Sequence, residues 1–277
     1  MELHDVALAF DNDPLYDAYT NEYLFDGQLS SYDDSTSDGA TIRRRILSFG
    51  PQYELPARRV LTIYGEQWLA GAYVDDGFQG EPIRRQATLK RADRLYSILT
   101  PSQACAAAVG TPAYGQRVYF KDMSNALTDS EYDAFWNVFF SPTEAVVKGT
   151  FLRDDLGVLY RVRNAYLPTE GLRVCQSDEL DSNARLSVVF DSGSYNPVTE
   201  TRVAGTTTVN GIWVEMPKFF RFRHRSEQLT QAGDISVFIP TTYTPKVGDQ
   251  FTMDSLKWQV LTFQAELDAW ALHSRLV

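Results

Sequence analysis

The sequence predicts a mainly β protein with two small antiparallel β-barrel or sandwich modules, a short helical insertion and an acidic N-terminal arm. Short apolar runs recur about every ten residues with turn-forming residues between them, which is typical of barrels and sandwiches. A hairpin pattern near the start of the chain returns near its end, and the excess negative charge is confined to residues 1–40. We therefore expect an arm and linker over 1–40, a β-rich module over 41–180 and a barrel module over 181–277.

The N-terminal arm carries ten acidic residues and no Lys or Arg. The remaining 26 acids balance the 26 Lys and Arg of the chain, so the net charge of −10 belongs to the arm. Leu15, Tyr19 and Tyr23 recur at helical spacing, which predicts a short amphipathic helix that docks on the body or on a neighbouring subunit. Ser30–Gly39 is expected to be a linker. The candidate contact residues of the arm are Asp11, Asp13, Asp17, Tyr19 and Tyr23.

Strand signals dominate the 41–180 module, with apolar runs at Val60–Tyr64 and Trp68–Val74 on either side of a turn. One helix is predicted near 128–140, because Thr128 and Glu131 have the spacing of a capping box. Its apolar stripe, which we assign to the core, consists of Tyr132, Phe135, Trp136 and Phe139.

The last module follows a boundary at Asp181-Ser182-Asn183. Gly233-Asp234 and Gly248-Asp249 each stand just ahead of a short apolar run. Gly supplies a positive φ and Asp can bond the backbone nearby, so each pair predicts a turn that leads into a strand. Trp258 lies in the strand that follows, and we expect it to be buried.

A repeated hairpin links the two modules. Leu61–Ala70 aligns without gaps to Phe251–Val260, and Phe151–Val162 aligns to both with two more residues in its turn. Two explanations stay open at this point. The modules are related barrels, or the segments share only the apolar–turn–apolar form of every hairpin.

No local motif predicts catalysis. None of the three histidines has a neighbour at metal-ligand spacing, and no P-loop, Cys-x-x-Cys or nucleophile elbow is present. Asp11, Asp13 and Asp17 have a partial likeness to a calcium loop, but they lack its central Gly and closing Glu. A paired-carboxylate glycosidase stays open, because folding can bring any two acids together. We assign no catalytic residue, no metal and no cofactor.

Cysteine usage and hydropathy predict the compartment. Cys105 and Cys175 can form at most one bridge, so we expect two reduced thiols in a protein made in the cytoplasm. No stretch approaches the ~20 apolar residues of a membrane span, and the N-terminus lacks the basic start of a signal peptide. We expect a soluble chain that is not secreted.

Two basic clusters are candidate partner surfaces. Strand alternation places Arg43 and Arg45 on one face, and in a downstream Phe-Arg alternation it places Arg221, Arg223 and Arg225 on one face. Each cluster fits the solvated face of a half-buried strand, a contact for an acidic arm, or a surface for DNA phosphates. We favour subunit or partner contact, because strict alternation suits burial of the Phe rings better than base stacking.

Short motifs within residues 185–277 carry a family resemblance. They are Arg185–Phe190, Asn196–Glu200, Gly233–Val237, Pro245–Asp249 and Trp258–Val260. With these motifs the last module is similar to head-closure (head-completion, stopper) proteins of tailed bacteriophages. Residues 1–180 exceed the single small module usual in that family, and a duplicated or decorated neck protein would account for the length.

The resemblance implies a virion structural protein without enzymatic activity, made in the host cytoplasm and built into the neck. Such subunits form a ring, commonly a dodecamer, with the portal or adaptor protein on the head side and a tail protein on the other. Packaged double-stranded DNA passes through the lumen without sequence-specific binding, and no membrane is involved. The alternatives are another tail component (a terminator, nozzle or baseplate subunit) and a carbohydrate-active or glycan-binding β protein.

Overall fold

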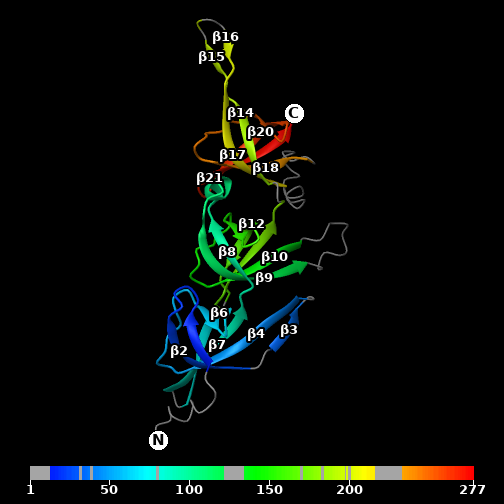
Figure 1. Cartoon of the computed structure of the whole chain (residues 1–277). Helices are drawn as coiled ribbons and strands as arrows, with labels where there is room; N and C mark the ends of the chain where they lie inside the picture. The colour runs from blue at the N-terminus through cyan, green and yellow to red at the C-terminus, as the bar shows by residue number, and fades with distance from the viewer. Residues whose placement is uncertain are drawn as a thin grey trace. The chain divides into compact units, whose positions relative to one another are not determined.

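The computed structural model describes residues 13–30, 33–37, 40–78, 81–121, 134–168, 171–181, 184–196, 198, 201–215 and 233–277. Strands dominate these residues (Figure 1), and two closed six-stranded antiparallel barrels confirm the predicted fold class. Among these residues no helix is long and apolar enough to cross a bilayer. By their contacts the residues group into two compact units, Met1–Ser97 with Pro112–Lys148 and Asp154–Glu179, and Ile98–Thr111 with Gly149–Arg153 and Leu180–Val277.

The first module is a seven-stranded sheet in which six strands also pair in a closed ring. Its strand order is β2-β1-β5-β6-β7-β4-β3, and β2 pairs in addition with β4, which leaves β3 at the edge. The strands are β1 (Asp13–Asp17), β2 (Tyr23–Leu29), β3 (Asp33–Ser37), β4 (Ala40–Phe49), β5 (Val60–Ile63), β6 (Glu66–Phe78) and β7 (Glu81–Arg91).

The helix predicted from Leu15, Tyr19 and Tyr23 is wrong. Leu15 lies in β1, Tyr23 begins β2, and Tyr19 lies in the turn between these antiparallel strands. Leu15 stands opposite Phe25 and both side chains are buried in the core of the first module, so strand pairing of the hairpin places them there. The predicted linker Ser30–Gly39 is also wrong in part, because it contains β3, which pairs with β4.

The second module is a closed barrel with the order β10-β13-β12-β11-β8-β9. Thr100 and Gln103 form a capping box for the one short helix among the described residues. The elements of this module are β8 (Arg94–Leu99), α2 (Pro101–Cys105), β9 (Thr111–Lys121), β10 (Ala134–Phe140), β11 (Phe151–Asp154), β12 (Leu159–Tyr166) and β13 (Arg173–Glu179).

The helix predicted near 128–140 is wrong over Ala134–Phe140, which form β10. This strand pairs with β9 on one side and with β13 on the other, and buried Val138 and Phe140 alternate with Phe139 at the period of a strand. Ladder pairing on both sides therefore overrides the apparent helical spacing of the aromatic residues. Thr128 and Glu131 lie outside the described residues.

The third module is a closed barrel with the order β14-β17-β18-β21-β20-β19. Gly233 and Gly248 have positive φ values of 94° and 91°, as the Gly-Asp pairs predict, and a strand begins shortly after each. Two further strands, β15 (Ser194–Asn196) and β16 (Thr201–Val203), form a two-stranded ribbon between β14 and β17. The barrel strands are β14 (Arg185–Asp191), β17 (Thr206–Glu215), β18 (Ile235–Pro240), β19 (Gln250–Met253), β20 (Leu256–Glu266) and β21 (Ala269–Leu276).

All three modules follow one strand path. We number the six ring strands of each module in chain order and leave out β3 and the ribbon. The first strand pairs with the second, the second with the third, and the third with the sixth. The sixth then pairs with the fifth, the fifth with the fourth, and the fourth with the first. The chain therefore carries this path three times, once more than the two modules predicted from the sequence.

The repeated hairpin of the sequence joins the fourth and fifth strands of each module. Leu61 stands opposite Trp68 and Phe251 opposite Trp258, so the two hairpins share one register. Each has a two-residue turn with both φ values positive, Tyr64-Gly65 in one and Asp254-Ser255 in the other, as a type I′ turn requires. In the second module residues 155–158 separate β11 from β12, which is the longer turn that the alignment predicts.

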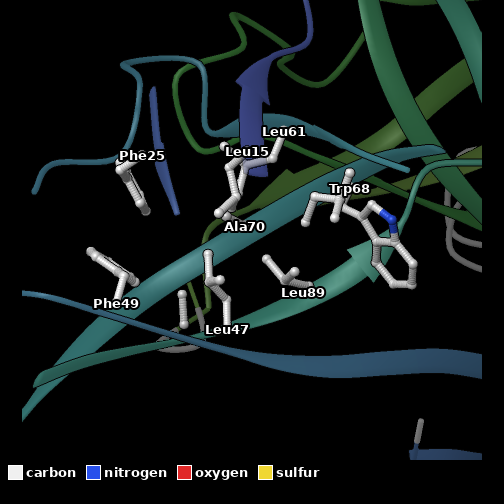
Figure 2. Packing of buried hydrophobic residues seen from close by; sticks show 10 residues of the cluster. Leu15, Phe25, Leu47, Phe49, Leu61, Trp68, Ala70 and Leu89 are labelled. Atoms are coloured by element: carbon white, nitrogen blue, oxygen red, sulfur yellow. The ribbon is translucent and has the colours of Figure 1, made fainter. Parts of the chain in front are cut away.

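Each closed ring packs its inward residues into a core. Figure 2 shows the core of the first module, where Trp68 lies beside Leu61 and Leu89 while Phe25 and Phe49 fill the other end. In the third module Trp258 packs in the equivalent cluster and is 8% exposed, which confirms its predicted burial. Cys105 and Cys175 are buried free thiols.

Candidate interaction surfaces

A polar contact joins the first two modules within one compact unit. Arg58 Nε lies 2.8 Å from Glu144 Oε1, and its Nη2 donates to the Pro112 carbonyl at 2.5 Å. The guanidinium also lies 3.6 Å from the centre of the Tyr19 ring. Tyr19 donates its hydroxyl proton to Glu144 at 3.4 Å and accepts the Tyr114 backbone N–H at 3.2 Å. Burial raises the pKa of Tyr19 to about 12, so this hydroxyl keeps its proton at neutral pH.

An apolar cluster lies in the same contact. Val60, Leu69 and Leu172 are buried together, and Phe139 of β10 packs against them. Lys90 lies 3.8 Å from the centre of the Phe139 ring. Gly171, with φ +80°, approaches the first module so closely that an added Cβ would lie 2.5 Å from the Ala72 backbone nitrogen. Val60 and Leu69 are thus outward residues of the first barrel that the second module covers.

A comparable set of contacts lies within the other compact unit. The Ser102 backbone N–H of α2 donates to Asp268 at 3.0 Å, and Arg185 donates to the Ala104 carbonyl at 3.0 Å. Phe151 of β11 meets Phe238 of β18 edge to face at 5.5 Å. Within this unit α2 and Phe151 therefore pack on strands of the third module.

The same strand positions supply both apolar contacts. Phe139 and Phe238 are the next-to-last and third-from-last residues of the third strands β10 and β18, and they stand opposite Val174 and Ala271 of the sixth strands. In the sixth strands, Val174 lies three residues before Ser177, and Ala271 lies three residues before Ser274. These serines stand opposite Val162 and Val260 of the fifth strands, respectively. By the same register the equivalent residue of the first module is Ser48, opposite Gln86.

The other half of each contact changes from apolar to polar along the chain. Val60, Phe151 and Gln250 are the first residues of the fourth strands. Val60 stands opposite Leu69, whereas Gln250 stands opposite Gln259. An outward apolar pair in the first module, buried against the second, is therefore a half-buried glutamine pair in the third.

The predicted contact residues of the arm serve largely internal roles. Asp17 Oδ1 accepts the backbone N–H groups of Tyr19 and Thr20 at 2.8 and 2.9 Å and so caps the β1–β2 turn. Tyr19 lies in the contact between the first two modules. Asp13 begins β1, and Tyr23 is 56% exposed with its ring edge on Tyr16. Asp11 lies outside the described residues.

The basic clusters are described only in part. Arg43 stands opposite Asp34 and Arg44 opposite Asp33 in the register of the β3–β4 pair. The Arg45 guanidinium lies 5.5 Å from the centre of the Trp68 ring. Both predicted partners of this cluster, a neighbouring subunit and DNA, stay predictions. Arg221, Arg223 and Arg225 lie outside the described residues.

Sequence reasoning missed a buried carboxylate in the second module. Asp154 ends β11, where the first and third modules have Ile63 and Met253, and it accepts a bond from Arg94 Nη1 at 3.1 Å. Tyr160 donates to it at 3.3 Å, and its other oxygen accepts the backbone N–H groups of the following loop. A polar residue at a repeat position that is otherwise apolar is the signal that could have found it.

A second polar cluster lies in the third module. Asp234, from the first Gly-Asp pair, receives Nε and Nη2 of Arg275 at 2.9 Å each and lies 3.1 Å from His273 Nε2. Asp249, from the second pair, accepts the Lys246 backbone N–H at 2.8 Å, the local bond predicted for it. Both oxygens of Asp154 and both oxygens of Asp234 accept hydrogen bonds from protein groups, which suits a structural role.

Within the described ranges no group of three His, Cys, Asp or Glu side chains is arranged to hold a metal ion. Comparison with protein-family models, with curated proteins and with solved structures finds no match.

Proposed function

We propose that this protein is a structural subunit of a tailed-phage particle, a ring-forming head-closure or neck protein that joins the portal and adaptor complex to the tail. One observation carries the proposal. Residues 185–277, whose motifs resemble head-closure proteins, coincide with one closed barrel, and the same strand path occurs twice upstream. A chain longer than a single head-closure module is then a tandem of such modules.

The charge distribution and the contacts support a scaffold. A ring around packaged DNA has to withstand pressure without gripping the duplex, and a net charge of −10 opposes binding to phosphates. Subunits of a ring meet through two different patches, one on each neighbour. In this proposal one end of the ring meets the portal or adaptor protein, the other meets a tail protein, and DNA passes through the lumen.

The test is the position and the copy number of the protein. We expect the purified chain to form rings in negative-stain images and in native mass spectra, and cryo-electron microscopy of particles to place it at the neck. Density at the tail tip or baseplate would favour the other tail components instead. A monomer that binds glycans and is missing from particles would overturn the proposal.

The arginines 221, 223 and 225 allow a second test. The variant R221S/R223S/R225S should keep the fold and lower the yield of rings, more so as salt screens the remaining charges. R84S is a matched control, because Arg84 pairs with Asp76 on an exposed strand within the chain. Filter binding separates the rival partner: salt-dependent DNA binding that the triple variant loses would assign these arginines to DNA.

A further inference from the structure

The link between the first and second strands of a module contacts the following module in both cases that the chain provides. In the first module this link is residues 18–22, and its Ala18 and Tyr19 pack in the cluster of Val60, Leu69 and Leu172. In the second module it is residues 100–110, which include α2, and α2 packs on β17 and β18 of the third module. We call this link the first connection.

The first connection of the third module is the longest of the three. Residues 192–205 separate β14 from β17 and carry the ribbon β15–β16. Figure 1 shows the ribbon projecting from the third barrel beyond the ends of β14 and β17. In the described part of the chain neither ribbon strand pairs with a third strand. A two-stranded ribbon alone is marginally stable in water, and its free edges offer backbone N–H and C=O groups.

The barrel surface next to the first connection is polar in the third module. In the first module that surface is Val60 and Leu69, buried beside Tyr19. In the third module the same positions are Gln250 and Gln259, which leave amide donors and acceptors at the surface. A partner at this place would be held mainly by hydrogen bonds and by pairing with strand edges, and less by apolar burial. Such a surface suits a contact that forms after the chain has folded.

We propose that the β15–β16 ribbon and the Gln250–Gln259 pair form the surface by which one copy of this chain docks on a module of a second copy. The reason for choosing a second copy is continuity with the two internal contacts, since the first connections of the first and second modules each dock on a barrel of the same strand path. Another copy supplies such a barrel. The inference rests on the proposed function in one respect, that copies of the chain assemble.

A loop exchange tests the surface. Residues 192–205 are replaced by Ala-Ser-Thr-Asn-Glu, which is the link of residues 18–22 with Tyr19→Ser. In the first module this five-residue link is long enough to join the first strand to the second. β1 and β14 both end in Asp, and in the first module this Asp caps the turn. We expect an unchanged unfolding midpoint and at least a tenfold loss of self-association in analytical ultracentrifugation.

Photo-crosslinking supplies a readout that does not depend on loop exchange. Val198 in the ribbon is 89% exposed and Val109 in the first connection of the second module is 85% exposed, so the two are matched sites for a benzoylphenylalanine residue. Position 198 should crosslink two copies of the 31.3 kDa chain, and position 109 should not.

The outcomes separate the inference from the proposed function. If the full chain assembles and the loop-exchanged chain assembles equally well, the inference fails and the proposed function stands. If the full chain is monomeric in solution and in particles, both fail. Crosslinks from position 198 to a different particle protein would overturn the choice of a second copy while leaving the virion role intact.

Discussion

Trp258 lies directly opposite Phe251 across the β19–β20 hairpin. The same pairing joins Trp68 to Leu61 in the first module. Two residues after each tryptophan comes a buried residue, Ala70 or Val260. Just after that residue, the pairing between the fifth and sixth strands shifts register. The tryptophan therefore holds a fixed place between a tight turn and a bulge, and its ring fills the core that the hairpin closes.

Removing this ring should destabilise the third module. Trp258→Ala is expected to lower the free energy of unfolding by about 3–5 kcal/mol, the range for deleting a buried aromatic side chain. Trp258→Phe should cost less, because the indole N–H has no hydrogen-bond partner among the described residues. Urea unfolding followed by circular dichroism measures both. Equal stability of the alanine variant and the wild type would contradict the assigned core.

The accuracy of the sequence predictions depended on how local their physical causes were. Turn chemistry at Gly233 and Gly248 and burial of Trp258 follow from neighbouring residues, and the structure confirms them. The helices predicted at Leu15–Tyr23 and near 128–140 failed, because aromatic residues four apart also suit strands and only distant partners decide. The contact of Tyr19 with Glu144 joins residues that are far apart in the chain, so no local sequence pattern could predict it.

Glu144 should stabilise the contact between the first two modules. Its side chain is 6% exposed and receives Arg58. Glu144→Ala removes charge-assisted hydrogen bonds and should cost about 1–3 kcal/mol. Glu54→Ala is the matched control, since Glu54 receives Arg85 but its side chain is 69% exposed, and its loss should change stability by less than about 0.5 kcal/mol. Equal effects of the two substitutions would refute a special role for Glu144.

Asp154 and Arg94 should behave as a coupled pair. Asp154→Ile restores the residue type of the first module but leaves two backbone N–H groups without their acceptor and Arg94 with only the more exposed Asp155, at a cost of about 3–5 kcal/mol. The double variant Asp154→Ile with Arg94→Leu should recover about 0.5–3 kcal/mol relative to the sum of the single changes. Chemical denaturation of the four proteins in the cycle gives the coupling. Simple additivity would show that the pair does not act together.

Alkaline pH should destabilise the fold through the buried thiols. Burial raises the pKa of Cys105 and Cys175 from 9.0 to about 12. Between these values the unfolded chain loses the thiol protons and the native chain keeps them, so the free energy of unfolding falls as pH rises above 9. Urea midpoints at about pH 8 and about pH 10 should show the fall, and Cys105→Ala with Cys175→Ala should make it shallower. An identical pH profile in wild type and double variant would rule this source out.

Deletion of residues 1–38 should unfold the first module. The sequence alone predicted an arm and linker over residues 1–40, outside the two modules, but Leu15 and Phe25 are 0% and 2% exposed in the core. Loss of β1 and β2 also opens the ring of pairings, because they join β5 to β4. We expect rapid proteolysis of residues 39–91 in this variant and native resistance in the full chain. A truncated chain that unfolds with wild-type cooperativity would contradict this placement.

An association role for the acidic N-terminal residues then has to be tested without deleting strands. Tyr23 is suitable, because its ring is 56% exposed and lies outside the buried core. Tyr23→Ser with Asp13→Asn should keep the unfolding midpoint within the range of surface substitutions, about 0.5 kcal/mol. If these residues contact a neighbouring subunit, the pair of changes lowers ring yield in native mass spectra. Full ring yield would leave Asp13 and Tyr23 with no role in assembly.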